Sequence, residues 1–324
     1  MKNKQLASGM HDKLFKRAQS IYRIEHEIAD FLIDAEFNRI ETPTIEYAGV
    51  FEDKVSTDNY HLFDKNGDLL VLRPDVTQSV ARLVASTKVK PPVKFSYSGK
   101  VFRYFDDMKG LQNERTQAGV ELIGYESEQA ILDALGAAQK SLEVVGIEAF
   151  TFEFSHADVL KLVFSAFEDA EVRTELANLT ENKNITGLVD FTKKYPSEFD
   201  DFIQNLPRLF GDSDLVLEIA RRVVKNAELL AIFDEIEKLL LATATIFERV
   251  TLDLAMIPTM PYYTGVMFQV FSKKIPYAFL SGGRYDDLFL SFGLERLTAV
   301  GWAIDVDALY EEIHDTVDFT GGKR

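Results

Sequence analysis

The sequence predicts an α+β fold in which helices pack against an antiparallel sheet. Long helical patterns open the chain and fill residues 160–245. Strand-like segments come in pairs joined by polar turns, and strand patterns resume after residue 245. Hairpins without regular strand–helix alternation are typical of antiparallel sheets. We therefore expect an antiparallel sheet with helices on one face and an inserted helical subdomain.

The chain opens with a predicted helix followed by an interrupted strand. Residues 11–37 carry apolar side chains near helical spacing with charges between them, which indicates a long amphipathic helix: Leu14, Ile21, Ile24, Ile28, Phe31 and Leu32. Pro43 interrupts the strand-like run that follows, because proline belongs at a strand edge or boundary.

Two hairpins and a helix are expected next. Asn66 and Gly67 favour the positive φ angles of a two-residue hairpin turn. A helix should follow Pro74 and cover about Val76 to Ala85. Residues 93–105 and 114–125 are strand-rich and are joined by a polar loop with a glycine, so they predict a longer hairpin.

The second half begins with a predicted helix and a strand. Residues 127–147 are helical in pattern, and residues 149–155 predict a strand that enters a helix, with Ser155 and Asp158 expected in its N-cap. Strands are expected again at 250–257, 263–272 and 277–283, and the last helical segment at 301–313. These patterns predict a body of residues 1–160 and 246–315, an inserted helical subdomain of residues 161–245 and a tail of residues 316–324.

Composition narrows the classes of function. The net charge of −16 disfavours nucleic-acid binding, which depends on clustered lysine and arginine. Without cysteine the chain has no disulfide, thiolate nucleophile or zinc-thiolate site, and its five histidines stand far apart, so no metal is expected. No segment approaches the roughly 20 apolar residues that span a bilayer. A cytoplasmic protein without membrane association or cofactor is therefore expected.

Six segments in order resemble the motifs of histidyl-tRNA synthetases, which are class II aminoacyl-tRNA synthetases. IETPTIE, with Pro43, resembles the first class motif, and LRPDVTQSVAR resembles the family's Leu-Arg-Pro-Glu-x-Thr segment. GKVFRYF with QAGVELIG resembles motif two, including its Phe102-Arg103 pair. PYYTGVMFQV and LSGGRYDDL resemble two histidine-specific signatures, and AVGWAIDVDAL takes the place of motif three. The resemblance implies a class II synthetase-like antiparallel sheet.

The sequence departs from that family where arginines would neutralise ATP phosphates. Three of the four expected arginine positions hold Leu111, Pro258 and Ala308 instead. Arg296, in FGLERL, imitates the end of motif three, but it precedes GWA and is assigned to a loop. Removing one preorganised transition-state donor typically costs about 10² to 10³ in rate, so no synthetase activity is expected. After Leu309 fifteen residues remain, so we expect no anticodon-binding domain.

The half of the family's pocket that binds the amino acid is better retained. By resemblance, Asp75 and Thr77 would hold the α-amino group of histidine, and Gln117 and Glu121 would meet its polar edge. Arg103 would pair with the carboxylate. Tyr262 and Tyr263 would enclose the imidazole. Asp75 replaces a longer glutamate, so its contact with the amine would need a water molecule.

A synthetase-like body that keeps this amino-acid pocket but lacks the arginines that contact ATP phosphates resembles the regulatory subunits of ATP phosphoribosyltransferase. This resemblance implies a dimeric, non-catalytic chain that activates a short catalytic subunit in the first step of histidine biosynthesis. L-histidine would be its inhibitory effector, bound in the synthetase-like pocket or at the junction with the catalytic subunit.

Other readings of the same residues stay open. The chain is alternatively a scaffold with a decayed pocket, or a synthetase paralogue that adenylates an amino acid. Taken singly, PYYTG reads as a turn with packed tyrosines, GGRYDD as a tight turn with a surface arginine, and Glu121 as a solvent-facing strand residue.

Overall fold

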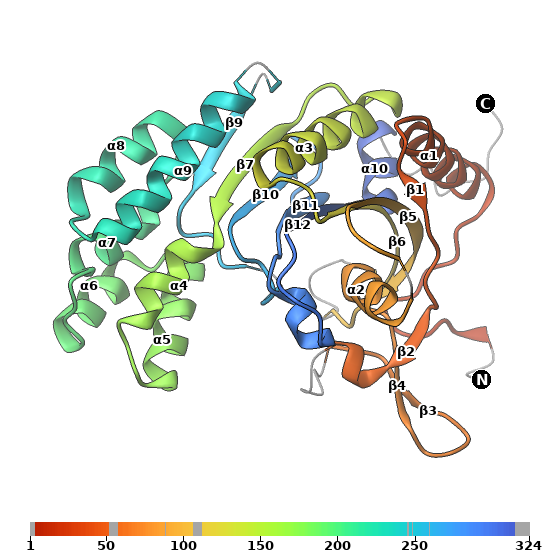
Figure 1. The fold of residues 1–324 in the computed structure, drawn as a ribbon, viewed down its shortest axis with the longest axis horizontal. Coiled ribbons are helices and arrows are strands. Elements are labelled where there is room, and N and C mark those ends of the chain that lie inside the picture. The colour runs from red at the N-terminus through yellow and green to blue at the C-terminus, as the bar shows by residue number, and fades with distance from the viewer. Residues whose placement is uncertain are drawn as a thin grey trace. The chain divides into compact units, whose positions relative to one another are not determined.

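The computed structural model has two compact units, each assembled from separate stretches of chain (Figure 1). Unit 1 contains residues 1–148, 273–280 and 287–324, and unit 2 contains residues 149–272 and 281–286. The structure describes residues 4–51, 58–87, 89–105, 112–244, 246–247, 249–258 and 260–314. The boundaries expected for the inserted helical subdomain, residues 161–245, stay a prediction.

The main strands of unit 1 form the predicted long hairpin and one later strand. β5 (Val93–Phe102) pairs antiparallel with β6 (Glu114–Ile123), and β6 pairs antiparallel with β12 (Ala299–Asp305). The short β1 (Asn38–Arg39) runs parallel to β5, which gives the order β1-β5-β6-β12.

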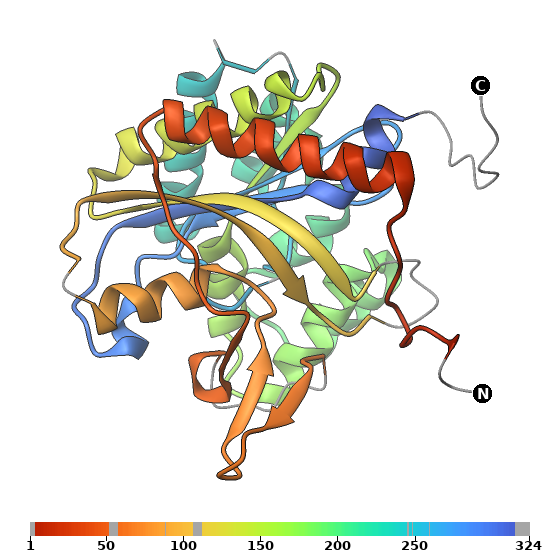
Figure 2. The ribbon, with the colours of Figure 1, turned by 90° about the vertical axis from the view of Figure 1, so that its right-hand side faces the viewer.

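Helices cover both faces of these strands. Figure 2 shows α1 (Phe15–Asp34) and α3 (Ser127–Val144) on one face, with α2 (Thr77–Ser86) and the 3₁₀ turn η5 (Leu288–Phe292) on the other. The expectation of helices on one face alone is therefore wrong for unit 1. The indole N–H of Trp302 donates to the carbonyl of Ala134 at 2.8 Å and so joins β12 to α3. α10 (Val306–Ile313) follows β12 directly.

Most of the apolar residues predicted to form a buried stripe on the first helix are buried. α1 buries Ile21, Ile24, Ile28 and Leu32, which recur at helical spacing. Leu14 precedes the helix and is 61% exposed, so its assignment to the buried stripe is wrong.

The predicted short hairpin forms, but its turn is longer than expected. β3 (His61–Phe63) and β4 (Leu69–Leu72) are antiparallel, and Phe63 lies opposite Leu69, so residues 64–68 form the turn. Gly67 has φ of 89°, whereas Asn66 is not among the residues with positive φ. Oδ1 of Asp64 accepts from the backbone N–H groups of Asn66 and Asp68, and these bonds hold the longer turn.

Pro43 lies between strands, as predicted. It separates β1 from β2 (Ile45–Tyr47), which joins β4 and β3 in a three-stranded sheet of order β2-β4-β3. The 3₁₀ turn η2 (Ala48–Phe51) follows β2, and the predicted helix after Pro74 is α2.

Unit 2 combines a second set of strands with helices. Its strand order is β11-β10-β7-β9-β8, and β7 is antiparallel to β10 and parallel to β9. Phe152, Phe154, Phe247 and Phe268 pack against one another in its core. The strands are β7 (Thr151–His156), β8 (Phe210–Asp212), β9 (Val250–Asp253), β10 (Val266–Phe271) and β11 (Leu280–Arg284). The helices are α4 (Ala157–Ser165), α5 (Ala170–Glu181), α6 (Ile185–Lys194), α7 (Asp200–Asn205), η4 (Leu206–Arg208), α8 (Ser213–Val223) and α9 (Ala227–Thr243).

Two local predictions in the second half are wrong. The N-cap of α4 is His156, whose Nδ1 accepts from the backbone N–H of Asp158; Ser155 is buried within β7. The segment 301–313 is not one helix, because residues 299–305 form β12 and the helix begins at Val306. Asp305 accepts from the N–H groups of Asp307 and Ala308 and caps this helix.

The prediction of a mainly antiparallel sheet is confirmed, although two pairs of strands are parallel. Most neighbouring strands are antiparallel, while β1 with β5 and β7 with β9 are parallel. Within the described part of the chain, no helix is both long and apolar enough for a membrane span.

Candidate functional site

One face of β6 carries two of the predicted site residues. Gln117 and Glu121 are four positions apart, so their side chains leave the same face of the strand. Glu121 is only 1% exposed, which rules out a solvent-facing side chain. On the neighbouring strand Gly301 lies opposite Glu121, and a Cβ at Gly301 would collide with Oε2 of that carboxylate. A glycine at 301 is therefore what makes room for Glu121.

The start of α2 meets this face of β6. The hydroxyl of Thr77 donates to Oε1 of Glu121 at 2.7 Å. Because the single hydroxyl hydrogen is used in this bond, the oxygen of Thr77 can only accept from a further group. Thr77 and Glu121, predicted separately from two motifs, thus form one hydrogen-bonded pair.

Asp75 lies just before α2 and is 5% exposed. Its Oδ1 accepts from the backbone N–H of Gln78 at 3.0 Å, whereas Oδ2 finds no hydrogen-bond donor among the described residues. Burial raises the pKa of Asp75, while the Arg103 guanidinium and the N–H groups of Gln78 and Thr77 act in the opposite direction. A buried carboxylate oxygen without a donor is costly unless a ligand supplies one.

Arg103 is positioned by the backbone around Asp75. Its Nε donates to the carbonyl of Pro74 at 2.9 Å, and its own backbone N–H donates to the carbonyl of Asn113. The guanidinium thus lies at the same end of the site as the Asp75 carboxylate, and the charge of Arg103 favours ionised Asp75.

Gln117 supplies a further acceptor. Its Oε1 is buried and lacks a hydrogen-bond partner in the part of the chain that the structure describes. Asp75, Thr77, Gln117 and Glu121 each present a side-chain oxygen that can accept a hydrogen bond, and we call these four residues the acceptor cluster. Such an arrangement suits a ligand that carries several N–H groups.

The tyrosine pair belongs to unit 2. The rings of Tyr262 and Tyr263 lie 5.3 Å apart between centroids, and Tyr262 also meets the ring of Tyr285 edge-on. A Cβ at Gly283 would lie 2.9 Å from the ring of Tyr263, so this glycine permits a close approach.

The two segments that resemble histidine signatures are tied to each other within unit 2. The hydroxyl of Thr264 accepts from the backbone N–H of Asp286, and the N–H of Thr264 donates to the carbonyl of Arg284, both at 2.8 Å. The carbonyl of Tyr263 accepts from Lys161, and Arg284 is paired with Asp286. A turn with packed tyrosines, the alternative reading of PYYTG, is present, and the role of Tyr262 and Tyr263 around an imidazole stays a prediction.

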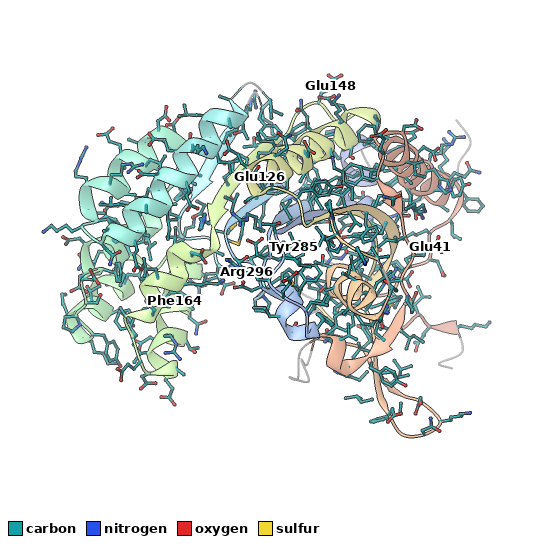
Figure 3. All side chains as sticks on the ribbon, in the orientation of Figure 1. Glu41, Glu126, Glu148, Phe164, Tyr285 and Arg296 are labelled. Atoms are coloured by element: carbon teal, nitrogen blue, oxygen red, sulfur yellow. The ribbon has the colours of Figure 1, made fainter. Side chains whose placement is uncertain are left out.

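The positions that lack the family's arginines carry no positive charge. Pro258 lies in the segment after β9, Ala308 is 1% exposed in α10, and Leu111 lies outside the described residues. Arg296 lies in the segment between η5 and β12, as expected, and its Nε contacts Asp287 at 2.7 Å (Figure 3).

Acidic residues at the place of motif three are paired with cations, which sequence reasoning missed. Asp305 accepts from Arg115 at 2.9 Å, and Asp307 pairs with Lys13 and accepts from the backbone N–H of Thr116. No local pattern in the sequence reveals partners 190 positions apart. These pairs join β6, α10 and the segment before α1.

Comparison with known proteins gives one consistent family. A family model described as histidyl-tRNA synthetase matches residues 9–309. Proteins named ATP phosphoribosyltransferase regulatory subunit are 52% identical in Streptococcus thermophilus, covering 99% of both chains, and 50% identical in Streptococcus gordonii, covering 98% of this chain and 97% of the relative. A relative of the same name in Listeria monocytogenes is 38% identical over 95% of this chain and 79% of its own.

Solved structures give the same fold. A Bacillus halodurans protein described as an ATP phosphoribosyltransferase regulatory subunit/histidyl-tRNA synthetase has a TM-score of 0.83 and 28% identity, over 96% of this chain and 84% of that chain. A histidyl-tRNA synthetase from Nostoc has a TM-score of 0.76 at 20% identity, over 96% of this chain and 75% of that chain, which supports the fold alone. The predicted class II synthetase-like fold is confirmed.

Proposed function

The chain belongs to the family of ATP phosphoribosyltransferase regulatory subunits, and from this premise we propose that it is a non-catalytic, histidine-sensing subunit. It activates a separate short catalytic subunit, which joins ATP to phosphoribosyl pyrophosphate, and it transmits inhibition by L-histidine. It acts as a dimer in the cytoplasm and uses neither a cofactor nor nucleic acid.

The acceptor cluster is the observation that carries this proposal. Oδ2 of Asp75 and Oε1 of Gln117 are buried without a donor among the described residues, and the hydroxyl oxygen of Thr77 can only accept. The ammonium group of an amino acid has three N–H donors, and a ring N–H can donate to Glu121. Free L-histidine supplies both kinds of donor, so these groups would be satisfied by the ligand.

We expect this site to discriminate strongly between histidine and amino acids that lack a ring N–H. Glu121 is 1% exposed, and Gly301 and Thr77 define the position of its carboxylate. An amino acid without a ring N–H would not make this hydrogen bond to the carboxylate, and a polar site discriminates against a missing donor far more strongly than against a missing methylene.

The uncharged residues at positions where the synthetase family has arginine support a role without catalysis. Transfer of an adenylyl group needs cations against the phosphates as charge moves in the transition state. Pro258 and Ala308 provide none, and in unit 1 Arg115 is already paired with Asp305. Binding of histidine without adenylation fits a sensor, whose binding free energy is coupled reciprocally to the catalytic subunit.

Calorimetric titration of L-histidine into the full chain tests the binding site. Glu121→Gln keeps the volume of the side chain but removes the charge, and we expect binding to weaken about tenfold or more, because charge-assisted hydrogen bonds are worth about 1.5–3 kcal/mol. Glu114→Gln is the matched control, since Glu114 lies on the same strand with a side chain 39% exposed. Equal affinity in all three proteins would contradict the proposal.

Reconstitution with the short catalytic subunit tests the regulatory role. We expect ATP phosphoribosyltransferase activity only when this chain is present, with inhibition by histidine that Glu121→Gln weakens while activation remains. Activation without any histidine response would identify a scaffold with a decayed pocket. Exchange of pyrophosphate into ATP that depends on an amino acid would identify an adenylating paralogue instead.

A further inference from the structure

Unit 2 contains a hollow whose lining includes no residue of the acceptor cluster. Its volume is about 300 Å³, and it lies where the end of α5 meets the segment after β9. It is lined by Thr180, Glu181, Lys183, Asp253, Ala255, Met256, Ile257 and Pro258. All of these residues belong to unit 2, whereas the acceptor cluster belongs to unit 1.

Lys183 gives the hollow a positive charge, and its backbone conformation is unusual for a lysine. Its φ is 47°, in the left-handed region that glycine adopts at helix ends without a steric penalty. Its Nζ lies 3.2 Å from Oδ2 of Asp253 and 3.6 Å from the centroid of the Phe210 ring. The lysine side chain is therefore held in place at a position where the backbone alone would favour glycine.

Carboxylates give the hollow a negative side. Asp253 is 8% exposed and accepts from the backbone N–H of Ala255 at 2.8 Å, which fixes Oδ1 and leaves Oδ2 towards Lys183. Glu181 also lines the hollow. Burial raises the pKa of nearby Glu153, and the negative charge of Asp253 adds to this effect. Two lining carboxylates against one ammonium disfavour a simple anion as ligand.

A buried hydroxyl in the lining lacks a partner. Thr180 is 1% exposed, and its Oγ1 makes no hydrogen bond to any residue that the structure describes. A buried hydroxyl of this kind is expected to have a partner, and a ligand in the hollow would supply one. The opposite wall is apolar, since residues 255–258 contribute alanine, methionine, isoleucine and proline side chains.

We propose that this hollow binds a zwitterionic α-amino acid with an apolar side chain. The ligand carboxylate pairs with Nζ of Lys183, its ammonium group meets Asp253 and Glu181, and its side chain lies against residues 255–258. Thr180 supplies a hydrogen bond to one of the charged ends. An imidazole would find few hydrogen-bonding side chains on the apolar wall, so this site prefers an apolar amino acid to histidine.

L-selenomethionine is the probe for this site, because its selenium can be located by anomalous scattering. We expect saturable binding to the full chain by calorimetry and a selenium peak in the hollow of soaked crystals. Lys183→Gly and Asp253→Asn should each weaken binding about tenfold or more, since each removes a charge-assisted hydrogen bond. The controls are Lys193→Ala and Asp190→Asn, which remove the same charges from an exposed pair on α6.

The variants separate binding from folding. Glycine suits the left-handed backbone at position 183, and asparagine at 253 keeps the oxygen that accepts from Ala255, so both variants should retain the wild-type melting temperature closely. Absence of binding, a selenium site elsewhere, or binding unchanged in Lys183→Gly would each overturn the proposal. Glu121→Gln, which weakens histidine binding in unit 1, should leave selenomethionine binding unchanged, so failure of one site is distinguishable from failure of the other.

Discussion

The hydroxyl of Thr77 donates to Oε1 of Glu121 at 2.7 Å, and this bond joins the first residue of α2 to the buried face of β6. Two residues from different motifs, 44 positions apart, are thereby held together by one hydrogen bond. The bond fixes the carboxylate that we propose as the recognition group for the imidazole.

Replacing this hydroxyl should affect stability and binding together. In Thr77→Val the Glu121 carboxylate loses a donor while remaining buried, so we expect the free energy of unfolding to fall by about 1–3 kcal/mol. Thr77→Ser keeps the hydroxyl and should retain histidine affinity. Urea unfolding and histidine calorimetry measure both effects. Equal histidine affinity in the valine and serine variants would contradict a role for the hydroxyl.

Gly301→Ala should disturb the same carboxylate from the neighbouring strand. The added Cβ would collide with Oε2 of Glu121, and overpacking of a buried site typically costs about 1–3 kcal/mol. Gly136→Ala is the matched control, because Gly136 lies within α3 with nothing inside 4 Å of an added Cβ. This control should gain about 0.5–1 kcal/mol from helix propensity. Urea unfolding of the two variants tests the contrast.

Asp75→Asn should be more stable than the wild type at neutral pH. Burial raises the pKa of Asp75, so the folded state binds this proton more tightly than the unfolded state. The stability that Asp75 contributes is thus present below its unfolded pKa and is lost as the pH rises through its folded pKa. The difference between variant and wild type should shrink as the pH is lowered from 7 towards 4, as followed by urea unfolding at each pH.

The same substitution should weaken histidine binding. Asparagine keeps an oxygen for the N–H of Gln78 but removes the charge that faces an ammonium group, so we expect a loss of about tenfold or more. Calorimetry on the stabilised variant would show this loss without any contribution from unfolding. Undiminished affinity would show that Asp75 does not hold the amine.

Glu36→Gly should stabilise the protein at the end of α1. Glu36 is exposed, has φ of 64°, and donates its backbone N–H to the carbonyl of Ile33. Glycine adopts this left-handed position without the steric cost of a Cβ, which should raise the free energy of unfolding by about 0.5–1 kcal/mol. Glu27→Gly, exposed within the same helix, should instead lower it by about 1 kcal/mol. Thermal unfolding of both variants measures the opposite signs.

Much of the fold could be predicted because local patterns and tertiary packing agree. The stripe from Ile21 to Leu32 and the hairpin of β5 and β6 follow directly from periodicity. The prediction of a helix over 301–313 fails at β12 because its apolar residues run without alternation into α10, and a buried strand shows no period of its own. Serine is a common N-cap, which favours Ser155 from sequence, whereas the N-cap of α4 in the structure is His156.

The candidate site was only partly accessible from sequence. The resemblance to histidyl-tRNA synthetases predicts Thr77 and Glu121 in one pocket, but it does not reveal the hydrogen bond between them. The role of Gly301 depends on strand register, and the pairing of Asp305 with Arg115 depends on a contact 190 positions apart. Such relationships arise only from tertiary structure.

Unit 1 is assembled from three stretches of chain, and this has a consequence for the protein during synthesis. β6 leaves the ribosome long before β12, which pairs with it along seven residues, and the whole of residues 149–272 is made in between. Until residue 299 emerges, this edge of β6 lacks its partner, and an unpaired strand edge favours aggregation. Premature termination before residue 299 should therefore yield insoluble protein rather than a smaller functional subunit.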